Sequence, residues 1–226
     1  MGQTFRQARY TGLVVGVLLG LQPAAVLAQP AWDGWYGGAV IAKSQSDGQF
    51  TPLGSAPYGT ADSNPAIGGA FVGYAFQKDS FVWGVEASYM TGLGSGGSFA
   101  HGAGSSSMDI STDSVASLGL RGGVAQGSAL FFASAGVARM DMQLDVNVFS
   151  PADTITFHDG VTTSYVGIGV AYQIDTGWFA QLEARHYNDF SASNPSMGFP
   201  NTTTTISPGT HHYTFDTVSL GIGLQF

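Results

Sequence analysis

The sequence predicts an all-β protein, an eight-stranded antiparallel up-and-down transmembrane β-barrel. Three observations lead to this prediction. Segments of about ten residues alternate between apolar and small or polar side chains, the connections between them alternate between long and short, and only 10% of the residues are charged, against about 25% in ordinary soluble domains. After the N-terminal region no apolar stretch approaches about 18 residues, which excludes spanning helices. A closed barrel is then the remaining way to pair every backbone group inside a bilayer.

The first 28 residues have the pattern of a secretory signal peptide. Two arginines precede an apolar run over about 13–21, and the small residues Val26 and Ala28 occupy the −3 and −1 positions of a cleavage site. The run is too short to cross about 30 Å of hydrocarbon as a helix. We therefore expect cleavage after Ala28 and one outer-membrane barrel domain over 29–226. The chain has no cysteine, so we expect no disulfide and no lipid attached to cysteine.

The predicted mature part is acidic. It contains five of the seven Lys and Arg residues and all 15 Asp and Glu residues. No basic stripe is available to meet a phosphate backbone, which argues against nucleic acid as a partner.

The first three predicted strands cover 35–43, 66–76 and 81–90. A long polar run separates the first from the second, and only "QKDS" separates the second from the third. The third alternates cleanly, with one face made of Phe81, Trp83, Val85, Ala87 and Tyr89 and the other of Gly84, Glu86 and Ser88. We expect the larger set to face lipid.

The fourth and fifth strands are predicted over roughly 110–124 and 129–140, joined by "QGS". A long Gly- and Ser-rich segment precedes the fourth strand, in which the outward set is Ala116, Leu118 and Leu120 and the opposite set is Ser117, Gly119 and Arg121. The fifth strand has apolar residues in both registers, so its facing stays open.

The last three strands are predicted over 164–174, 178–187 and about 212–226. "DTG" is the tight turn between the first two of these, and long polar loops lie before the first and the last. The outward sets are Val166, Ile168, Val170 and Tyr172; Trp178, Ala180, Leu182 and Ala184; and Val218, Leu220, Ile222, Leu224 and Phe226.

The alternation of connections places four long loops at one end and three tight turns with both termini at the other. In bacterial outer-membrane barrels the long loops are extracellular and the tight turns and termini are periplasmic. A soluble barrel of lipocalin type would point its apolar residues inward. The interior of an eight-stranded barrel is only wide enough for side chains to fill it, so the strand faces with the larger side chains are expected to face lipid and the faces with the smaller ones the lumen. Aromatic residues near strand ends also suggest interfacial girdles, formed by Trp35, Tyr36, Phe81, Trp83, Tyr89 and Trp178.

By this alternation several charged and amide side chains face the barrel lumen. The predicted polar network comprises Glu86, Arg121, Gln173, Gln181, Glu183, Arg185 and Gln225. A charge inside a narrow barrel is costly unless it is paired, so we interpret the network as an ionic and hydrogen-bonded plug. The functional alternative is a selective pore with Glu86 and Arg121 at its constriction.

Four segments resemble the small eight-stranded outer-membrane barrels of the OmpA-like, opacity-protein and surface-antigen group. They are Trp32/Gly34/Tyr36/Gly38, "SVASLGLRGGVAQGSALFFASAGVAR", Glu183/Arg185/Tyr187 and the terminal "VSLGIGLQF". The spacing of the first is slightly shifted from the usual motif. The resemblance implies outer-membrane lipid, lipopolysaccharide and the barrel-assembly machinery as partners, with Phe226 in the role of the assembly signal. We expect no periplasmic peptidoglycan-binding domain after the barrel.

Some eight-stranded barrels are enzymes that modify lipid A, which makes the histidines of this chain candidate catalytic residues. His186 precedes Asp189, Ser191 and Ser193, and His101 lies among serines. A Ser-His-acid set needs hydrogen-bond contact between base and nucleophile, whereas His186 shares the outward face of its strand near the long-loop rim. The His-x-Ser-Asn pattern of barrel deacylases is absent. His211 and His212 lack evident further ligands for a four-coordinate metal.

The expected function is therefore a structural or surface-interaction role in the cell envelope. A small porin-like channel is the alternative, and a lipid A-modifying enzyme the distant one. We expect no catalytic activity, no cofactor and no metal. The long loops, rich in Gly, Ser, Thr, Asn and Asp, are suited to contact with host or surface ligands, although composition does not identify the ligand.

Overall fold

The computed structural model describes the chain from Trp32 onward, except residues 53–57, 64–65, 93–96, 102–105, 150–151, 195–196, 199–204 and 207–208. Side chains are described outside 46–65, 93–110, 144–155 and 190–213 and outside positions 112, 142, 157 and 159. The predicted signal peptide lies outside the described residues. Within the described part of the chain no helix is long and apolar enough to cross a bilayer.

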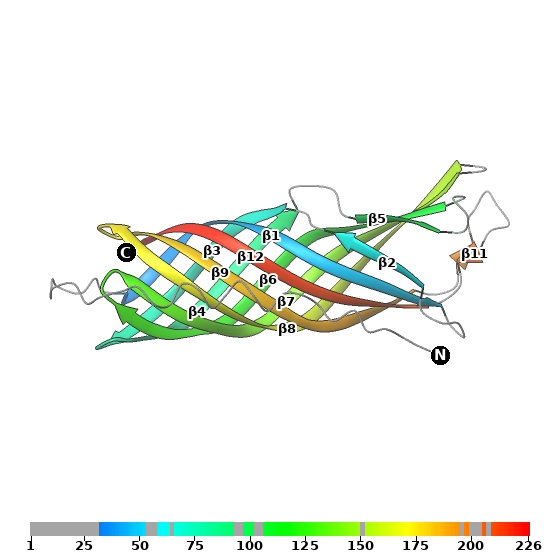
Figure 1. The fold of residues 1–226 in the computed structure, drawn as a ribbon. Coiled ribbons are helices and arrows are strands. Elements are labelled where there is room, and N and C mark those ends of the chain that lie inside the picture. Colours follow the sequence, from blue (N-terminus) through cyan, green and yellow to red (C-terminus); the bar gives the residue numbers. More distant parts are fainter. Residues whose placement is uncertain are drawn as a thin grey trace, which may run out of the picture.

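Eight strands form a closed, all-antiparallel barrel, which confirms the predicted fold (Figure 1). The barrel strands are β1 (Gly34–Pro52), β3 (Ala66–Lys78), β4 (Phe81–Gly92), β6 (Ser106–Gln126), β7 (Ala129–Phe149), β8 (Ala152–Asp175), β9 (Trp178–Asn194) and β12 (Gly209–Gln225). Each pairs with its sequence neighbour in the barrel, and β12 pairs with β1 from Gln225↔Tyr36 to Gly209↔Pro52 to close the ring. The apolar segment "VSLGIGLQF" at the end of the sequence is therefore one side of the ladder that closes the barrel.

Tight turns join the strands where the sequence predicts them. Residues 79–80, 127–128 and 176–177 connect β3 to β4, β6 to β7 and β8 to β9, and we call this the short-turn end. Asp79, Gly127 and Gly177 have positive φ there, the conformation that reverses the chain within two residues. The opposite end, where the long connections lie, is the long-loop end.

The strands are longer than predicted at the long-loop end. β8 begins at Ala152, although the sequence suggests a loop until about Val161, and β7 continues to Phe149. The predicted loops also contain four short strands, β2 (Tyr58–Ser63), β5 (Gly97–His101), β10 (Met197–Gly198) and β11 (Thr205–Ile206). The prediction depended on apolar alternation, and these polar segments lack it because a strand beyond the bilayer has no lipid face to fill.

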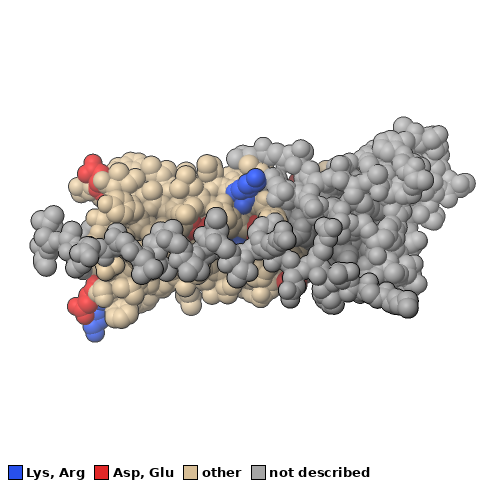
Figure 2. Space-filling model, viewed as in Figure 1, with Lys and Arg blue, Asp and Glu red and all other residues tan. Residues whose placement is uncertain are grey.

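The outer wall is apolar over a height that matches one bilayer. On β12 the outward side chains from Phe226 to Val218 are large, apolar and 36–75% exposed, a run of nine residues when both ends are counted. A transmembrane β-strand needs about 9–11 residues. Charged or polar side chains follow at the long-loop side, namely Asp216 on β12, His186 on β9, Arg139 on β7 and Lys43 on β1. On the face shown in Figure 2 few charged atoms appear between the two ends.

The predicted facing is confirmed for β4, β6, β8, β9 and β12, and the structure settles β7. Leu130, Phe132, Ala138 and Met140 of β7 are buried in the lumen, whereas Val137 is 53% exposed. The sequence left this facing open because the lumen is itself apolar at both ends of the strand.

Glycines make room for aromatic rings inside the barrel. A Cβ at Gly73 would overlap the Tyr36 ring, and one at Gly223 would overlap the Phe179 ring. Gly169 stands against Phe132 in the same way. Part of the glycine content therefore has a packing cause, since these three rings lie against positions without a side chain.

Candidate functional site

Glu86 is the centre of a charged layer in the middle of the lumen. Its carboxylate accepts hydrogen bonds from Arg121 Nη1 at 3.0 Å, Arg185 Nη2 at 2.9 Å and the Tyr36 hydroxyl at 3.1 Å. The side chains of Glu86, Arg121 and Arg185 are 6%, 9% and 7% exposed. β4, β6 and β9 supply the three charges. The pair with Arg121 joins the neighbouring strands β4 and β6, whereas the pair with Arg185 crosses the lumen from β4 to β9.

Glu183 completes the layer and balances its charge. Arg185 Nη2 donates to Glu183 Oε2 at 2.9 Å, and the Ser134 hydroxyl donates to Glu183 Oε1 at 2.6 Å. Arg185 Nη1 also donates to Ser117 Oγ at 3.2 Å. We call Glu86, Arg121, Glu183 and Arg185 the ion layer. It has two negative and two positive charges, which lets a buried charge cluster persist without a net charge.

Aromatic rings and an amide extend the contacts of both arginines. Arg121 lies 3.4 Å from the ring centroid of Phe132, and Arg185 lies 4.8 Å from that of Tyr165. A desolvated guanidinium over an aromatic face is an attractive arrangement. Arg121 Nη1 also donates to Gln181 Oε1 at 2.9 Å. Each arginine thus contacts carboxylate, ring and polar groups, whereas its buried Nε–H has no hydrogen-bond acceptor among the described residues.

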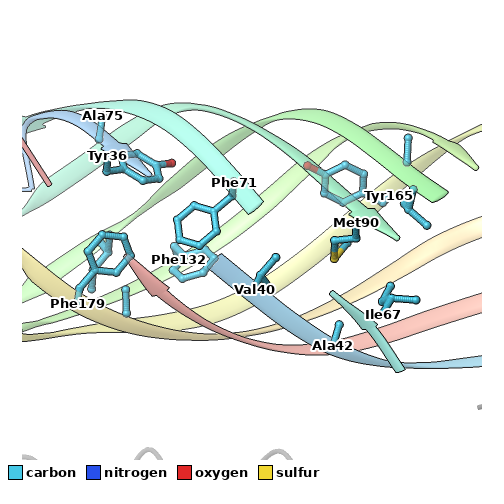
Figure 3. Close-up of a cluster of buried hydrophobic side chains, with 14 of the residues drawn as sticks. Tyr36, Val40, Ala42, Ile67, Phe71, Ala75, Met90, Phe132, Tyr165 and Phe179 are labelled. Carbon is cyan, nitrogen blue, oxygen red and sulfur yellow. The ribbon is translucent and has the colours of Figure 1, made fainter. Parts of the chain in front are cut away.

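Aromatic side chains close the lumen between the ion layer and the short turns. This turn-side seal consists of Trp32, Tyr36, Phe71, Phe132 and Phe179 (Figure 3 labels the last four). Phe179 lies at its centre, with ring centroids 5.8 Å from Trp32 and 6.1 Å from both Tyr36 and Phe71. Such edge and tilted contacts are the favoured geometries of aromatic pairs.

A second apolar group closes the lumen on the other side of the ion layer. This loop-side seal consists of Ile67, Val115, Met140, Tyr165, Tyr187 and Phe215, each at most 2% exposed. Tyr187 packs between two of the rings, 5.6 Å from Tyr165 and 5.2 Å from Phe215. The ion layer therefore lies between two apolar seals.

The spaces left inside these layers are about the size of a water molecule. A cavity of about 20 Å³ lies in the turn-side seal beside Trp32, Tyr36 and Arg121, and one of about 10 Å³ lies in the ion layer beside Glu86 and Arg185. A single water needs about 10–15 Å³ on this measure. Neither cavity is a passage for a solute.

The structure brings five of the seven predicted network residues together. Glu86, Arg121, Gln181, Glu183 and Arg185 share contacts within the lumen. By contrast, Gln173 and Gln225 line a hollow at the short-turn end.

Sequence reasoning missed part of this site. Tyr36 was assigned to the outer girdle, and that prediction is wrong, since the residue is 6% exposed and bonds to Glu86. The alternation of β1 contained the signal, because Tyr36 shares its parity with Val40 and Ala42 in the lumen. The other five predicted girdle residues are outward and about half exposed.

Outward histidines lie near the long-loop side of the wall. His186 Nδ1 is 2.6 Å from Asp216 Oδ1, with both side chains about half exposed. His158 lies 3.7 Å from Asp113. The side chains of His101, His211 and His212 lie outside the described residues. Among the described side chains no group of three or more His, Cys, Asp or Glu residues could hold a metal ion.

A closed barrel with an apolar wall one bilayer high defines the class of outer-membrane barrels. The family model of the outer membrane protein beta-barrel domain matches residues 13–226. The chain belongs to this family and is located in the bacterial outer membrane. No curated protein matches the chain in sequence.

Solved structures share the fold at low identity. The outer membrane protein OprG from Pseudomonas aeruginosa is 12% identical, with 86% of this chain and 96% of that chain covered and a TM-score of 0.57. The outer membrane protease OmpT from Escherichia coli is 11% identical, with 86% and 97% covered and a TM-score of 0.53. Ail, the attachment invasion locus protein of Yersinia pestis, is 13% identical, with 86% and 99% covered and a TM-score of 0.44. The likeness to OprG and OmpT is one of fold.

Proposed function

We propose that this protein is a closed, non-catalytic scaffold of the outer membrane that holds its long connections on the cell surface for interaction with other molecules. The three-layered lumen is the observation that supports this role. An ion layer with no net charge lies between two apolar seals, and the remaining cavities have room for about one water each. Conduction of a solute would require all three layers to open together.

The placement of charges on the wall supports the proposed orientation. The long connections are extracellular and the short turns and termini periplasmic, as in other outer-membrane barrels. Lys43 is an exposed cation at the long-loop side of the apolar wall, and Arg139 lies there too, paired with the exposed Asp141. In this orientation both side chains lie on the side of the lipopolysaccharide. From this level β6, β7 and β8 continue as paired strands, which extends the barrel wall beyond its apolar part.

Single-channel recording in planar bilayers tests the closed scaffold. The refolded wild-type barrel is expected to be electrically silent while a known porin, added to the same bilayer, conducts. Discrete openings by the purified barrel would refute the scaffold and establish the porin-like alternative.

The fold alone does not exclude catalysis, since OmpT shares it and is named as a protease. The proposed lack of catalysis therefore depends on the residues of this chain. His186 is paired with Asp216, and the Ser164 hydroxyl on the neighbouring strand accepts a hydrogen bond from the Asn188 amide. The nearby serine is thus bonded to an amide, whereas an activated nucleophile would be bonded to the base. Lipid A mass spectra of expressing and deleted cells are expected to be identical, and a loss or gain of an acyl chain would contradict the proposal.

A further inference from the structure

Trp32 fills the short-turn mouth of the lumen but belongs to no strand. It precedes β1 and is 5% exposed, with its ring edge-on to Phe179. The chain can turn inward here because Gly34 has a φ of 113°, which side chains rarely adopt. A large aromatic ring is therefore buried by a short segment outside the barrel ladder.

Side-chain hydrogen bonds hold this segment in place. The Trp32 backbone N–H donates to Gln77 Oε1 at 2.6 Å, and the Gln77 backbone N–H donates to Asp33 Oδ1 at 3.0 Å. The Gln225 amide donates to the Asp33 carbonyl at 2.7 Å. The two bonds to Asp33 are exposed, so water can replace them at small cost. Elements held in this way open more readily than strands in a closed ladder.

The space that the indole occupies is shaped for an aromatic ring. Trp32 and its ring neighbour Phe179 line a cavity of about 20 Å³. The rest of its lining is mostly apolar and includes Tyr36, Val82, Leu130, Phe132 and Arg121, whose charge is paired with Glu86. The buried Trp32 Nε1–H has no hydrogen-bond acceptor in the described structure, so the seated side chain carries an uncompensated polar group. Apolar cavities of this kind bind small aromatic molecules when their own side chain is removed.

We infer that the short-turn mouth of the lumen is a binding site for small, neutral, planar aromatic molecules, and that Trp32 is a displaceable stopper that occupies it. A ligand enters from the short-turn side and takes the place of the indole against Phe179. The ion layer stays closed beneath it. Binding here is independent of the closed-scaffold role, because it needs no passage through the barrel.

The test measures binding of 5-fluoroindole by fluorine NMR to four proteins refolded in the same detergent. They are the wild type, Trp32→Ala, Gln77→Ala and Trp35→Ala. Trp32→Ala empties the site and Gln77→Ala loosens the stopper. Trp35→Ala is the matched control, because it removes an indole that is 54% exposed on the lipid face three residues away. Heat-modifiable gel migration establishes that each barrel is folded.

Trp32→Ala is expected to bind the probe at least about tenfold more tightly than the wild type, because the competing side chain is gone. Gln77→Ala should fall between them, since apparent affinity rises with the fraction of molecules whose site is open. Trp35→Ala should match the wild type. Benzothiophene, which has the same shape without an N–H, should displace the probe at least as well as indole does.

Equal binding by Trp32→Ala and Trp35→Ala would overturn the site. Binding by Trp32→Ala together with wild-type behaviour of Gln77→Ala would overturn the stopper, since Trp32 would then be a fixed part of the wall. Should Trp32→Ala fail to fold, Gln77→Ala against the wild type still decides, and equal affinities would overturn the inference.

Discussion

Replacing Glu86 with Gln removes the charge that both lumen arginines share. The amide is nearly isosteric, so it changes the electrostatics of the ion layer more than its packing. Arg185 would then have only Glu183 as a carboxylate partner and Arg121 would have none, and the ion layer would have a net positive charge. We expect Glu86→Gln to lower the free energy of unfolding strongly.

The size of this effect follows from the geometry. Two unit charges about 4 Å apart attract by about 4 kcal/mol at an effective dielectric constant of about 20, and Glu86 makes two such contacts. The cost of desolvation offsets part of this attraction. Removing one partner of a buried pair costs about 3–5 kcal/mol in measured cases, and this range is our expectation for Glu86→Gln.

Urea unfolding of the refolded barrel in lipid vesicles, followed by tryptophan fluorescence, measures the change. Arg139→Gln is the matched control, because it breaks an ion pair with Asp141 whose side chains are 61% and 51% exposed. An exposed pair contributes about 0–1 kcal/mol. The double variant Glu86→Gln with Arg121→Gln has no net charge in the ion layer, so it should lose less than the sum of the single changes, by about 0.5–3 kcal/mol. A Glu86→Gln loss no larger than that of Arg139→Gln would refute a dry, energetically coupled ion layer.

Four further predictions concern packing in the lumen, assembly and the outer wall. Gly73→Ala should destabilise the barrel by about 1–3 kcal/mol in the urea assay, because its Cβ would overlap the Tyr36 ring. Gly122→Ala is the control: its Cβ would point into open space, so the free energy of unfolding should change by at most about 0.5 kcal/mol, and equal effects of the two changes would contradict the packing explanation. Phe215→Ala opens the loop-side seal and should cost about 3–5 kcal/mol, and a loss below about 1 kcal/mol would show that the seal is loose. Deleting Phe226 removes one backbone hydrogen bond to β1 and should lower the stability of the refolded protein by only about 0.5–1.5 kcal/mol. If the assembly machinery recognises Phe226, the deletion should strongly reduce the amount of folded barrel in cells, and an unchanged amount would count against that role. His186→Ala should change the free energy of unfolding by at most about 1 kcal/mol, since its ion pair is exposed, and a larger loss would place it in the packed structure.

Alternation of side chains was enough to predict strand number, closure and most of the facing. It works where the wall is apolar and the lumen small or polar, as in β4 and β9. It failed for β7 and Tyr36, because the seals put large apolar or aromatic residues on the inner face as well. Trp32 belongs to the family motif but lies outside the predicted first strand, and its burial could not be predicted. Its position depends on a backbone turn at Gly34 and on contacts with residues more than 40 positions away. Contacts across the lumen join β4 to β9, and no local pattern encodes such a pairing.

The ion layer also bears on how the sequence specifies one barrel. A slip of β9 by one residue would exchange its faces, so that Leu182 and Ala184 entered the lumen and Glu183 and Arg185 met lipid. An arginine on the lipid face costs about 2–4 kcal/mol at the bilayer midplane and less toward the interface, where Arg185 lies beside Thr217. The slip would also leave Glu86 without one of its two cations. Alanine and leucine would lose little by the same exchange, because the lumen already accepts apolar side chains in both seals. The few charges in this chain therefore discriminate between registers more sharply than its many apolar residues do, which explains why a barrel with so little charge keeps four of its charged residues buried at one level.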